Sequence, residues 1–296
     1  MLDQYVFHDM TFTWLEGMKV NSDGGTLFGP VPKAVWNRYY PANDLNQIPT
    51  VTDPILIQYQ GKNYLVDTSL NPEKLNKKMR RNIGAVDDGD IKGSLVSLGL
   101  SRHDIDGVIM THMHNDHSNG LTMYDNDELV STYPNATIYV NEIEWNDVRH
   151  PNDRTRNTYL KENWEPIQEQ VQTYKHKLEV APGITVEHTG GHSRGHSIIR
   201  FEQEGETMIH LADLLLTYVQ TNPLWVGAVD DYPMDSIKAK KKLLTETFEN
   251  HYRVLFYHNP FYRVIEYSED GKSILYGLEN SREVAIPMTD KQDKAF

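Results

Sequence analysis

The sequence predicts an α/β fold in which strands and helices alternate along the chain and pack in layers. Short apolar runs that suit buried strands, such as residues 184–188 and 254–257, are separated by segments whose apolar residues recur at helical spacing, such as residues 235–248. At 296 residues the chain can bury a large core, and the sequence shows neither a fixed-period repeat nor a low-complexity linker. We therefore predict a single domain over residues 1–296.

The first third of the chain is expected to begin with a structured loop over about residues 1–50, because Gly and Pro recur there, as in residues 29–32. Residues 55–59 and 63–67 flank a Gln-Gly-Lys turn and are predicted to form a hairpin. A helix is expected to begin near Pro72, where proline suits the first turn. Asp90 can cap a second helix, which ends at Gly99.

The later elements follow the same alternation. Strands are predicted at residues 107–110, 137–140, 184–188, 197–202, 207–211, 254–257 and 264–267, and helices at residues 141–149, 159–174 and 235–248. The polar segment from about 146 to 175 is interpreted as an insertion that forms a lid or the contact of a homodimer, with a solvated loop as the equal alternative. On the last helix four lysines lie opposite the apolar residues, which predicts a solvated face of Lys238, Lys240, Lys241 and Lys242.

The composition excludes several kinds of site and partner. The 29 Lys and Arg residues against 42 Asp and Glu give a net charge of -13, so nucleic acid is not an expected partner. The chain has no cysteine, so any metal must be bound by His and carboxylate side chains. No stretch reaches the roughly 18 apolar residues of a membrane span, and the first ten residues lack a secretory pattern. We expect a cytoplasmic protein with a small-molecule substrate and no membrane partner.

A cluster of metal-ligand residues, His112-Met113-His114-Asn115-Asp116-His117, directly follows the apolar run 107–110. Alternate side chains of an extended segment share a face, so His112, His114 and Asp116 can converge, and His117 reaches round a turn. Four ligands are crowded for one tetrahedral metal but suit two metals that each take about three protein ligands. The alternative is a set of surface histidines with an Asp helix cap.

Three later residues can supply the missing ligands. His192 follows Gly190-Gly191, where the backbone can turn tightly and present an imidazole. Asp213 ends the apolar run 208–212, and its two carboxylate oxygens can bridge two cations. His258 follows the apolar strand 254–257. Each residue alone is equally well explained as a structural group, but their shared position at strand ends predicts a bridged pair of metal ions.

In this order, the motif HxHxDH, a glycine-preceded His, an Asp and a His resembles the metallo-β-lactamase superfamily. The resemblance implies a four-layer αβ/βα sandwich with two metal ions at one edge. It assigns His112, His114 and His192 to one metal, Asp116, His117 and His258 to the other, and Asp213 to both. Asp67 matches a family Asp that orients a ligand imidazole from behind. Zinc is the default for both ions, with iron, manganese and cobalt left open.

Within the superfamily, several branches fit poorly. His114 stands where flavodiiron oxidoreductases carry Glu, the lack of cysteine excludes the Cys-using β-lactamases, and too few residues follow His258 for the helical domain of glyoxalase II. Five stretches instead resemble quorum-quenching lactonases of the YtnP type: residues 23–33, 53–57, 189–193, 222–225 and 231–233. This resemblance implies hydrolysis of N-acyl-homoserine lactones. Leu216 departs from it, because many such lactonases carry a Tyr there that contacts the lactone.

The mechanism expected from this centre is attack by a metal-bridging hydroxide on the lactone carbonyl, with Asp116 carrying a proton to the leaving oxygen. Leu216 and four aromatic residues in irregular segments are the candidates for the pocket wall, namely Phe28, Trp36, Trp225 and Tyr232. Two alternatives remain open. One is a phosphotriesterase or arylesterase of the methyl-parathion-hydrolase type, and the other is a metal-binding or sensing protein without turnover.

Overall fold

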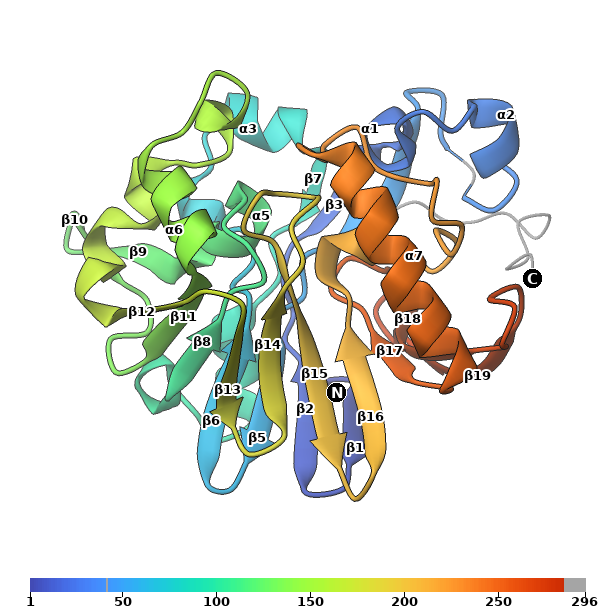
Figure 1. Cartoon of the computed structure of the whole chain (residues 1–296). Helices are drawn as coiled ribbons and strands as arrows, with labels where there is room; N and C mark the ends of the chain where they lie inside the picture. Colours follow the sequence, from blue (N-terminus) through green and yellow to red (C-terminus); the bar gives the residue numbers. More distant parts are fainter. Residues whose placement is uncertain (41, 285–296) are drawn as a thin grey trace.

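The computed structural model describes residues 1–40 and 42–284, and two sheets that face each other form its centre (Figure 1). The first sheet has the order β1-β2-β5-β6-β8-β11-β12, with strands β1 (Gln4–Phe7), β2 (Met10–Trp14), β5 (Ile55–Tyr59), β6 (Lys62–Val66), β8 (Gly107–Ile109), β11 (Thr137–Asn141) and β12 (Val171–Tyr174). Strands β6, β8, β11 and β12 run parallel to one another.

The second sheet runs from β13 to β19 in chain order. Its strands are β13 (Lys177–Ala181), β14 (Ile184–His188), β15 (Ser197–Gln203), β16 (Glu206–His210), β17 (Arg253–Leu255), β18 (Tyr262–Tyr267) and β19 (Ile274–Glu279). All neighbours pair antiparallel except β16 and β17, which run parallel. The carboxyl ends of β16 and β17 therefore meet at one edge of this sheet.

Smaller elements surround the two sheets. A three-stranded sheet contains β4 (Gln47–Val51), β3 (Lys19–Asp23) and β7 (Ala85–Asp87), and a hairpin contains β9 (Thr122–Asp125) and β10 (Glu128–Ser131). The α-helices are α1 (Gly24–Phe28), α2 (Lys33–Trp36), α3 (Lys77–Asn82), α4 (Ile91–Ser97), α5 (Asn115–Ser118), α6 (Glu142–Arg149) and α7 (Pro233–Glu249). Short 3-10 turns occupy Pro72–Lys74, Arg102–Asp104, Asn119–Leu121, Thr155–Asn157, Lys161–Asn163, Glu165–Gln170 and Ala212–Leu215.

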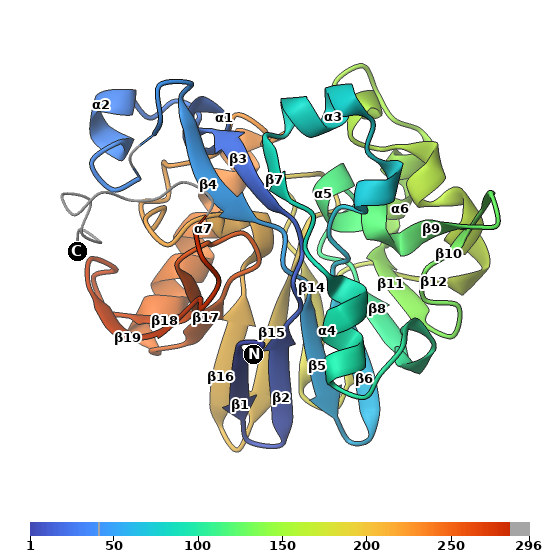
Figure 2. The ribbon, with the colours of Figure 1, turned by 180° about the vertical axis from the view of Figure 1, so that it is seen from behind.

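Alternation of side chains along the strands produces four layers. On β5, Ile55 and Ile57 pack into the core between the two sheets, whereas Leu56 packs into the outer core with α4 and α6. On β16, Met208 faces the inner core, whereas Ile209 packs beneath α7. Figure 2 shows α4 lying over β5 and β6, and Figure 1 shows α7 over the opposite sheet. This arrangement confirms the predicted four-layer αβ/βα sandwich.

Two segments differ from the prediction. Residues 1–50 are not a loop, because the strands β1 to β3 and all but the last residue of β4 lie within them. Met10, Phe12 and Trp14 alternate into the core on β2, and the Gly and Pro residues further on hid this short period-2 pattern. The predicted helix over 159–174 is also wrong, since 3-10 turns lead directly into β12. Pro166 lies inside the segment and cannot donate the backbone hydrogen bond of a continuing helix.

The strand ends place the ligand-type side chains at one edge of the sandwich. His112 follows β8 of the first sheet, and Asp213 and His258 follow the parallel strands β16 and β17 of the second. His192 follows β14 from the same sheet. In the described ranges, no helix is long and apolar enough to cross a membrane.

Candidate metal centre

The loop that follows β8 is held from behind by Asp67, at the end of β6. The Oδ1 atom of Asp67 accepts the Thr111 backbone N–H at 2.9 Å, and Oδ2 accepts the Thr111 hydroxyl at 2.7 Å. Oδ2 also lies 2.9 Å from Nδ1 of His117, at the turn α5. Asp67 has a φ of 52°, a costly conformation that these three contacts stabilise. The structure thus places Asp67 where the resemblance put it, behind an imidazole.

Four imidazoles of the cluster each use Nδ1 for a fixed partner and turn Nε2 towards a common centre. The Nδ1 contacts are His117 to Asp67 at 2.9 Å, His192 to Asp230 at 2.8 Å, His258 to the Val51 carbonyl at 2.8 Å and His112 to the Thr111 hydroxyl at 3.1 Å. A partner on the second nitrogen fixes both the tautomer and the direction of a metal-binding imidazole. The fifth, His114, instead directs Nδ1 at Nε2 of His192, 2.9 Å away.

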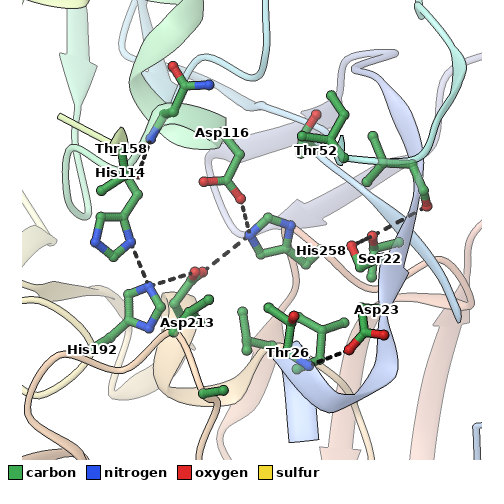
Figure 3. Close-up of a pocket in the computed structure, with 18 of the residues that line it drawn as sticks. Ser22, Asp23, Thr26, Thr52, His114, Asp116, Thr158, His192, Asp213 and His258 are labelled. Carbon is green, nitrogen blue, oxygen red and sulfur yellow. Dashed lines mark hydrogen bonds and ion pairs between the residues drawn. The ribbon is translucent and has the colours of Figure 1, made fainter. Parts of the chain in front are cut away.

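Asp213 lies in the middle of this group (Figure 3). Its Oδ2 atom is 3.2 Å from Nε2 of His192 and 3.4 Å from Nε2 of His117, and its Oδ1 atom is 3.4 Å from Nε2 of His258. Asp116 reaches the same region with Oδ2, 3.6 Å from Nε2 of His258. One carboxylate therefore contacts imidazoles from both predicted ligand sets.

Three groups of residues could each hold a metal ion, because the three ligand atoms within each group lie within 4.8 Å of one another. The groups are His112, His114 and His192; His112, His117 and Asp213; and Asp116, His117 and His258. The first and third sets are the two triads assigned from the sequence, and the second joins them through Asp213. The structure brings all seven predicted ligand residues together.

Two polar atoms in the centre test whether a cation fits. Nε2 of His112 and Oδ1 of Asp213 are buried and have no hydrogen-bond partner within residues 1–40 and 42–284. A buried polar atom without a partner costs free energy, and native structures rarely leave one unexplained. A bound divalent ion would supply the partner that both atoms lack, so the donor set fits a metal.

The electrostatics of the centre lead to the same conclusion. Burial lowers the pKa of His112 and His114 well below the usual range, which keeps them in the neutral form that binds metal. Burial also acts to lower the pKa of His117, but the Asp213, Asp116 and Asp67 carboxylates outweigh it and raise that pKa well above the usual range. The carboxylates therefore favour positive charge at this position, which a metal ion would provide.

A cavity of about 560 Å³ opens directly onto the centre. His114, Asp116, His192, Asp213 and His258 form its floor. The N-terminal segment, the irregular segment after α6, and the loop before α7 supply much of the wall, including Val20, Ser22, Thr26, Leu27, Thr50, Arg154, Thr158, Leu216, Ala228, Val229 and Asp231. Arg154 fixes part of the rim, because its Nε lies 2.5 Å from Oδ1 of Asp231.

Of the five residues predicted for the pocket wall, only Leu216 lines this cavity. Phe28 and Trp36 are fully buried and stacked on each other at 5.0 Å, with Trp225 edge-on to Phe28. Helices α1 and α2 turn these rings into the outer core, so Leu27 faces the cavity and its neighbour Phe28 does not. Tyr232 is partly exposed but does not line the cavity. Phe28, Trp36 and Trp225 therefore lie behind the wall, in the same core cluster as the lining residues Leu27 and Leu216.

Several residues that support the centre were missed from the sequence. Asp230 anchors His192 through its side chain. The neighbouring Asp231 pairs with Arg154 instead, and the sequence alone does not distinguish the two adjacent aspartates. The ring of Tyr257 stacks on His117 at 4.6 Å, and its hydroxyl donates to the Asp116 carbonyl at 2.9 Å. Of Asp230 and Tyr257, only Tyr257 carried a usable signal, as the residue before a predicted ligand. His196, for which structural hydrogen bonding is the expected role, accepts the Asp213 backbone N–H on Nε2 at 3.2 Å.

Comparison with known proteins gives a family match over most of the chain. The model of the metallo-beta-lactamase superfamily matches residues 48–258, a range that includes all seven candidate ligand residues. A crystal structure described as a probable metal-dependent hydrolase from Staphylococcus aureus is 37% identical, covers 95% of this chain and 100% of its own, and has a TM-score of 0.90. Among curated proteins, none matches the sequence.

More distant structures share the fold. The dizinc quorum-quenching lactonase AidC, solved with the product N-hexnoyl-L-homoserine, is 18% identical with a TM-score of 0.76, and the alignment covers 95% of this chain and 98% of AidC. The hydrolase AbOPH of the beta lactamase superfamily is 22% identical with a TM-score of 0.75, at the same coverage of both chains. At these identities the likeness concerns the fold alone.

Proposed function

The chain belongs to the metallo-beta-lactamase superfamily, and from that membership we propose that it is a hydrolase with two divalent metal ions that opens the lactone ring of N-acyl-homoserine lactones. The observation that carries the proposal is the set of anchored imidazoles around Asp213, which opens onto a cavity. A purely structural zinc site normally has all its positions filled by protein ligands, whereas a catalytic site keeps one open. The open floor of the cavity thus favours catalysis over a metal-stabilised binding protein.

The residue assignments follow the two outer triads. His112, His114 and His192 would hold one ion, and Asp116, His117 and His258 the other. Asp213 would bridge the ions, because its oxygens face imidazoles of both sets at 3.2 and 3.4 Å. Zinc is the default metal, while iron, manganese and cobalt accept the same ligand types. Ions bound there would lower the pKa of a water molecule towards neutrality and polarise the lactone carbonyl.

The residues of the chain then have separate tasks in the hydrolysis. Asp67 and Asp230 hold His117 and His192 in fixed orientations. Asp116 is the ligand-type carboxylate with the largest exposure, 42% of its side chain, and it lines the cavity. We assign it the proton transfer: it takes the proton that the attacking water loses and delivers it to the ring oxygen as the C–O bond breaks.

The cavity suits a substrate of small-molecule size. Its volume of about 560 Å³ lies within the usual range for small-molecule sites. Val20, Leu27 and Leu216 offer apolar surface for an acyl chain, and Ser22 and Thr50 offer hydroxyl groups for its amide. The lactonase AidC shares this fold, so the fold is compatible with a lactone substrate.

One observation supports a second candidate substrate class, the organophosphate triesters and aryl esters. Leu216 lines the cavity and has no hydroxyl to contact a lactone, in the position where many lactonases carry Tyr. An organophosphate triester or aryl ester needs no such contact. Lactone opening in a pH-stat should be compared with nitrophenol release from a phosphotriester by the same metal-loaded preparation. A large preference for the triester would overturn the lactone assignment.

Metal analysis together with a panel of lactones and esters tests the hydrolase itself. We expect about two metal ions per chain and turnover of at least one lactone. Fewer than about two ions, or no turnover of any panel member, would contradict the proposed enzyme and favour a binding or sensing protein.

A further inference from the structure

Glu144 is a buried carboxylate outside the candidate metal centre. It joins the loop of His112 and His114 to the loop of His192. Glu144 lies in the first turn of α6 and is 0% exposed. No part of the hydrolytic mechanism uses it. Helix α6 begins where β11 ends, and its cap Asn141 accepts the Ile143 backbone N–H at 2.9 Å, so the helix start is firmly placed.

Glu144 accepts four hydrogen bonds, two on each oxygen. Oε1 accepts the Met113 backbone N–H and the Tyr159 hydroxyl, each at 2.8 Å. Oε2 accepts the Ser193 hydroxyl at 2.6 Å and the Gly195 backbone N–H at 3.2 Å. Met113 lies between the ligands His112 and His114, and Ser193 follows the ligand His192. One side chain therefore ties together the two loops that carry all three residues of one triad.

The backbone is shaped for this contact. A Cβ atom at Gly195 would lie 2.2 Å from the Glu144 backbone nitrogen, so only glycine allows the His192 loop to approach α6 this closely. The four donors also require a carboxylate. An ionised carboxylate only accepts hydrogen bonds, whereas the NH₂ group of a glutamine would face a backbone N–H of either Met113 or Gly195, neither of which can accept.

We propose that Glu144 is a positioning residue that holds the His112-His114 loop and the His192 loop at the separation that one metal ion requires. The inference rests on the proposed function, because it takes His112, His114 and His192 as ligands of one ion. Second-layer partners of metal ligands act in this way, and their loss typically lowers metal affinity about 10- to 100-fold. The same loss is expected for Glu144→Gln.

The test compares metal affinity at matched stability. Wild type, Glu144→Gln and Ser193→Ala would be freed of metal and titrated with Zn²⁺ against a chromophoric chelator, and Co²⁺ would report ligand geometry through its visible spectrum. Phe201→Leu, in the inner core on β15 against Phe12, supplies a control that loses stability without touching the centre. Tyr159→Phe is the matched control within the cluster, because it removes one hydrogen bond to Glu144 and leaves both loops tied.

We expect Zn²⁺ affinity about 10- to 100-fold weaker in Glu144→Gln, roughly 2- to 10-fold weaker in Ser193→Ala, and unchanged in Phe201→Leu at an equal loss of thermal stability. The Co²⁺ spectrum should change only in the first two variants, and Tyr159→Phe should lose less affinity than Ser193→Ala. If Glu144→Gln does not fold, the Zn²⁺ affinities of Ser193→Ala and Tyr159→Phe decide the question. A loss no larger in Ser193→Ala than in Tyr159→Phe would then overturn the positioning role.

The outcomes separate the two proposals. If wild type binds about two ions and both Glu144→Gln and Ser193→Ala bind them equally well, the positioning role is overturned while the hydrolase proposal stands. If affinity falls equally in Phe201→Leu, the effect is general destabilisation and the positioning role is again overturned. Failure of wild type to bind metal would overturn both.

Discussion

Individual imidazoles in the centre are oriented by partners that lie far away in the sequence. His192 depends on Asp230, His258 on the carbonyl of Val51, and His117 on Asp67. The ligand motif itself was readable from the sequence, because HxHxDH is local and its residue types are specific to metals. Among the partners, Asp67 was reached through the family resemblance, whereas Asp230 and the Val51 carbonyl could not be predicted, since they are common groups that only the fold brings to the site.

Asp230→Ala should weaken metal binding about 10- to 100-fold, because His192 loses the acceptor that fixes its tautomer. The measurement is a Zn²⁺ titration of the metal-free protein. Asp231→Ala is the matched control, since the neighbouring carboxylate pairs with Arg154 on the cavity rim. Equal losses of affinity in the two variants would contradict a specific role for Asp230.

Asp116→Asn should slow lactone opening about 100-fold or more, because the amide cannot carry a proton to the leaving oxygen. A nitrophenyl ester needs no such proton, so its hydrolysis should fall much less. The rates are to be compared at a measured metal content, since Asp116 is also an assigned ligand. Full metal content together with full lactonase activity would rule out proton transfer by Asp116.

The sequence pattern of helix α7 predicted the helix correctly but the exposure of one of its residues, Lys240, wrongly. The sequence predicted a helix over 235–248, and the structure has α7 at Pro233–Glu249. Lys240 was expected on a solvated face, yet it is 2% exposed and its Nζ donates to the Trp225 carbonyl at 2.6 Å. The loop before α7 folds over this face of the helix, which no local pattern could reveal.

Lys240 predicts a pH dependence of stability. Burial lowers its pKa from 10.5 to about 7 in the folded chain. Between these values the unfolded chain binds one proton more than the folded chain, so the free energy of unfolding rises with pH in this window. Relative to Lys240→Met, the metal-free wild type should gain about 1.4 kcal/mol per pH unit above pH 7. Urea unfolding of both proteins at pH 7, 8 and 9 provides the measurement, and a pH-independent difference would contradict this account.

Strands were predicted best where they are apolar runs in the interior. The prediction for residues 184–188 coincides with β14, and the predicted run 254–257 lies across β17 and the residues before His258. Strands β1, β3 and β12 were missed, because their residues are partly exposed and form no apolar run. Such short strands form because a neighbouring strand pairs with them, and that pairing is invisible in a local window of sequence.

At the scale of the whole molecule, the candidate metal centre draws its residues and their partners from three different sheets. His112 comes from the first sheet, Asp213 and His258 come from the second, and the Val51 carbonyl bonded to His258 lies on β4 of the third. Ions bound here would cross-link all three sheets. The N-terminal segment, misread as a loop, is therefore part of both the cavity wall and the support of a ligand.

Removal of metal should lower stability without unfolding the chain. A ligand that binds only the folded state stabilises it by about 2.7 kcal/mol per site at a free concentration 100-fold above Kd. With 296 residues the entropy of unfolding is about 0.6 kcal/mol/K, so this free energy corresponds to a decrease in Tm of roughly 4 °C per site on chelation. Calorimetry with and without chelator measures the decrease, and Zn²⁺ should restore the original Tm. An unchanged Tm would contradict metal binding to the folded chain.

The most direct test of the central claim is pH-stat measurement of N-acyl-homoserine lactone opening by the protein with a measured metal content, on short and long acyl chains. We expect about two ions per chain and a kcat/KM of about 10⁴ M⁻¹ s⁻¹ or more for at least one lactone. The activity should disappear with chelator and return with metal. Protein that holds two ions and leaves every lactone intact, or hydrolyses a phosphotriester far faster, would contradict the account.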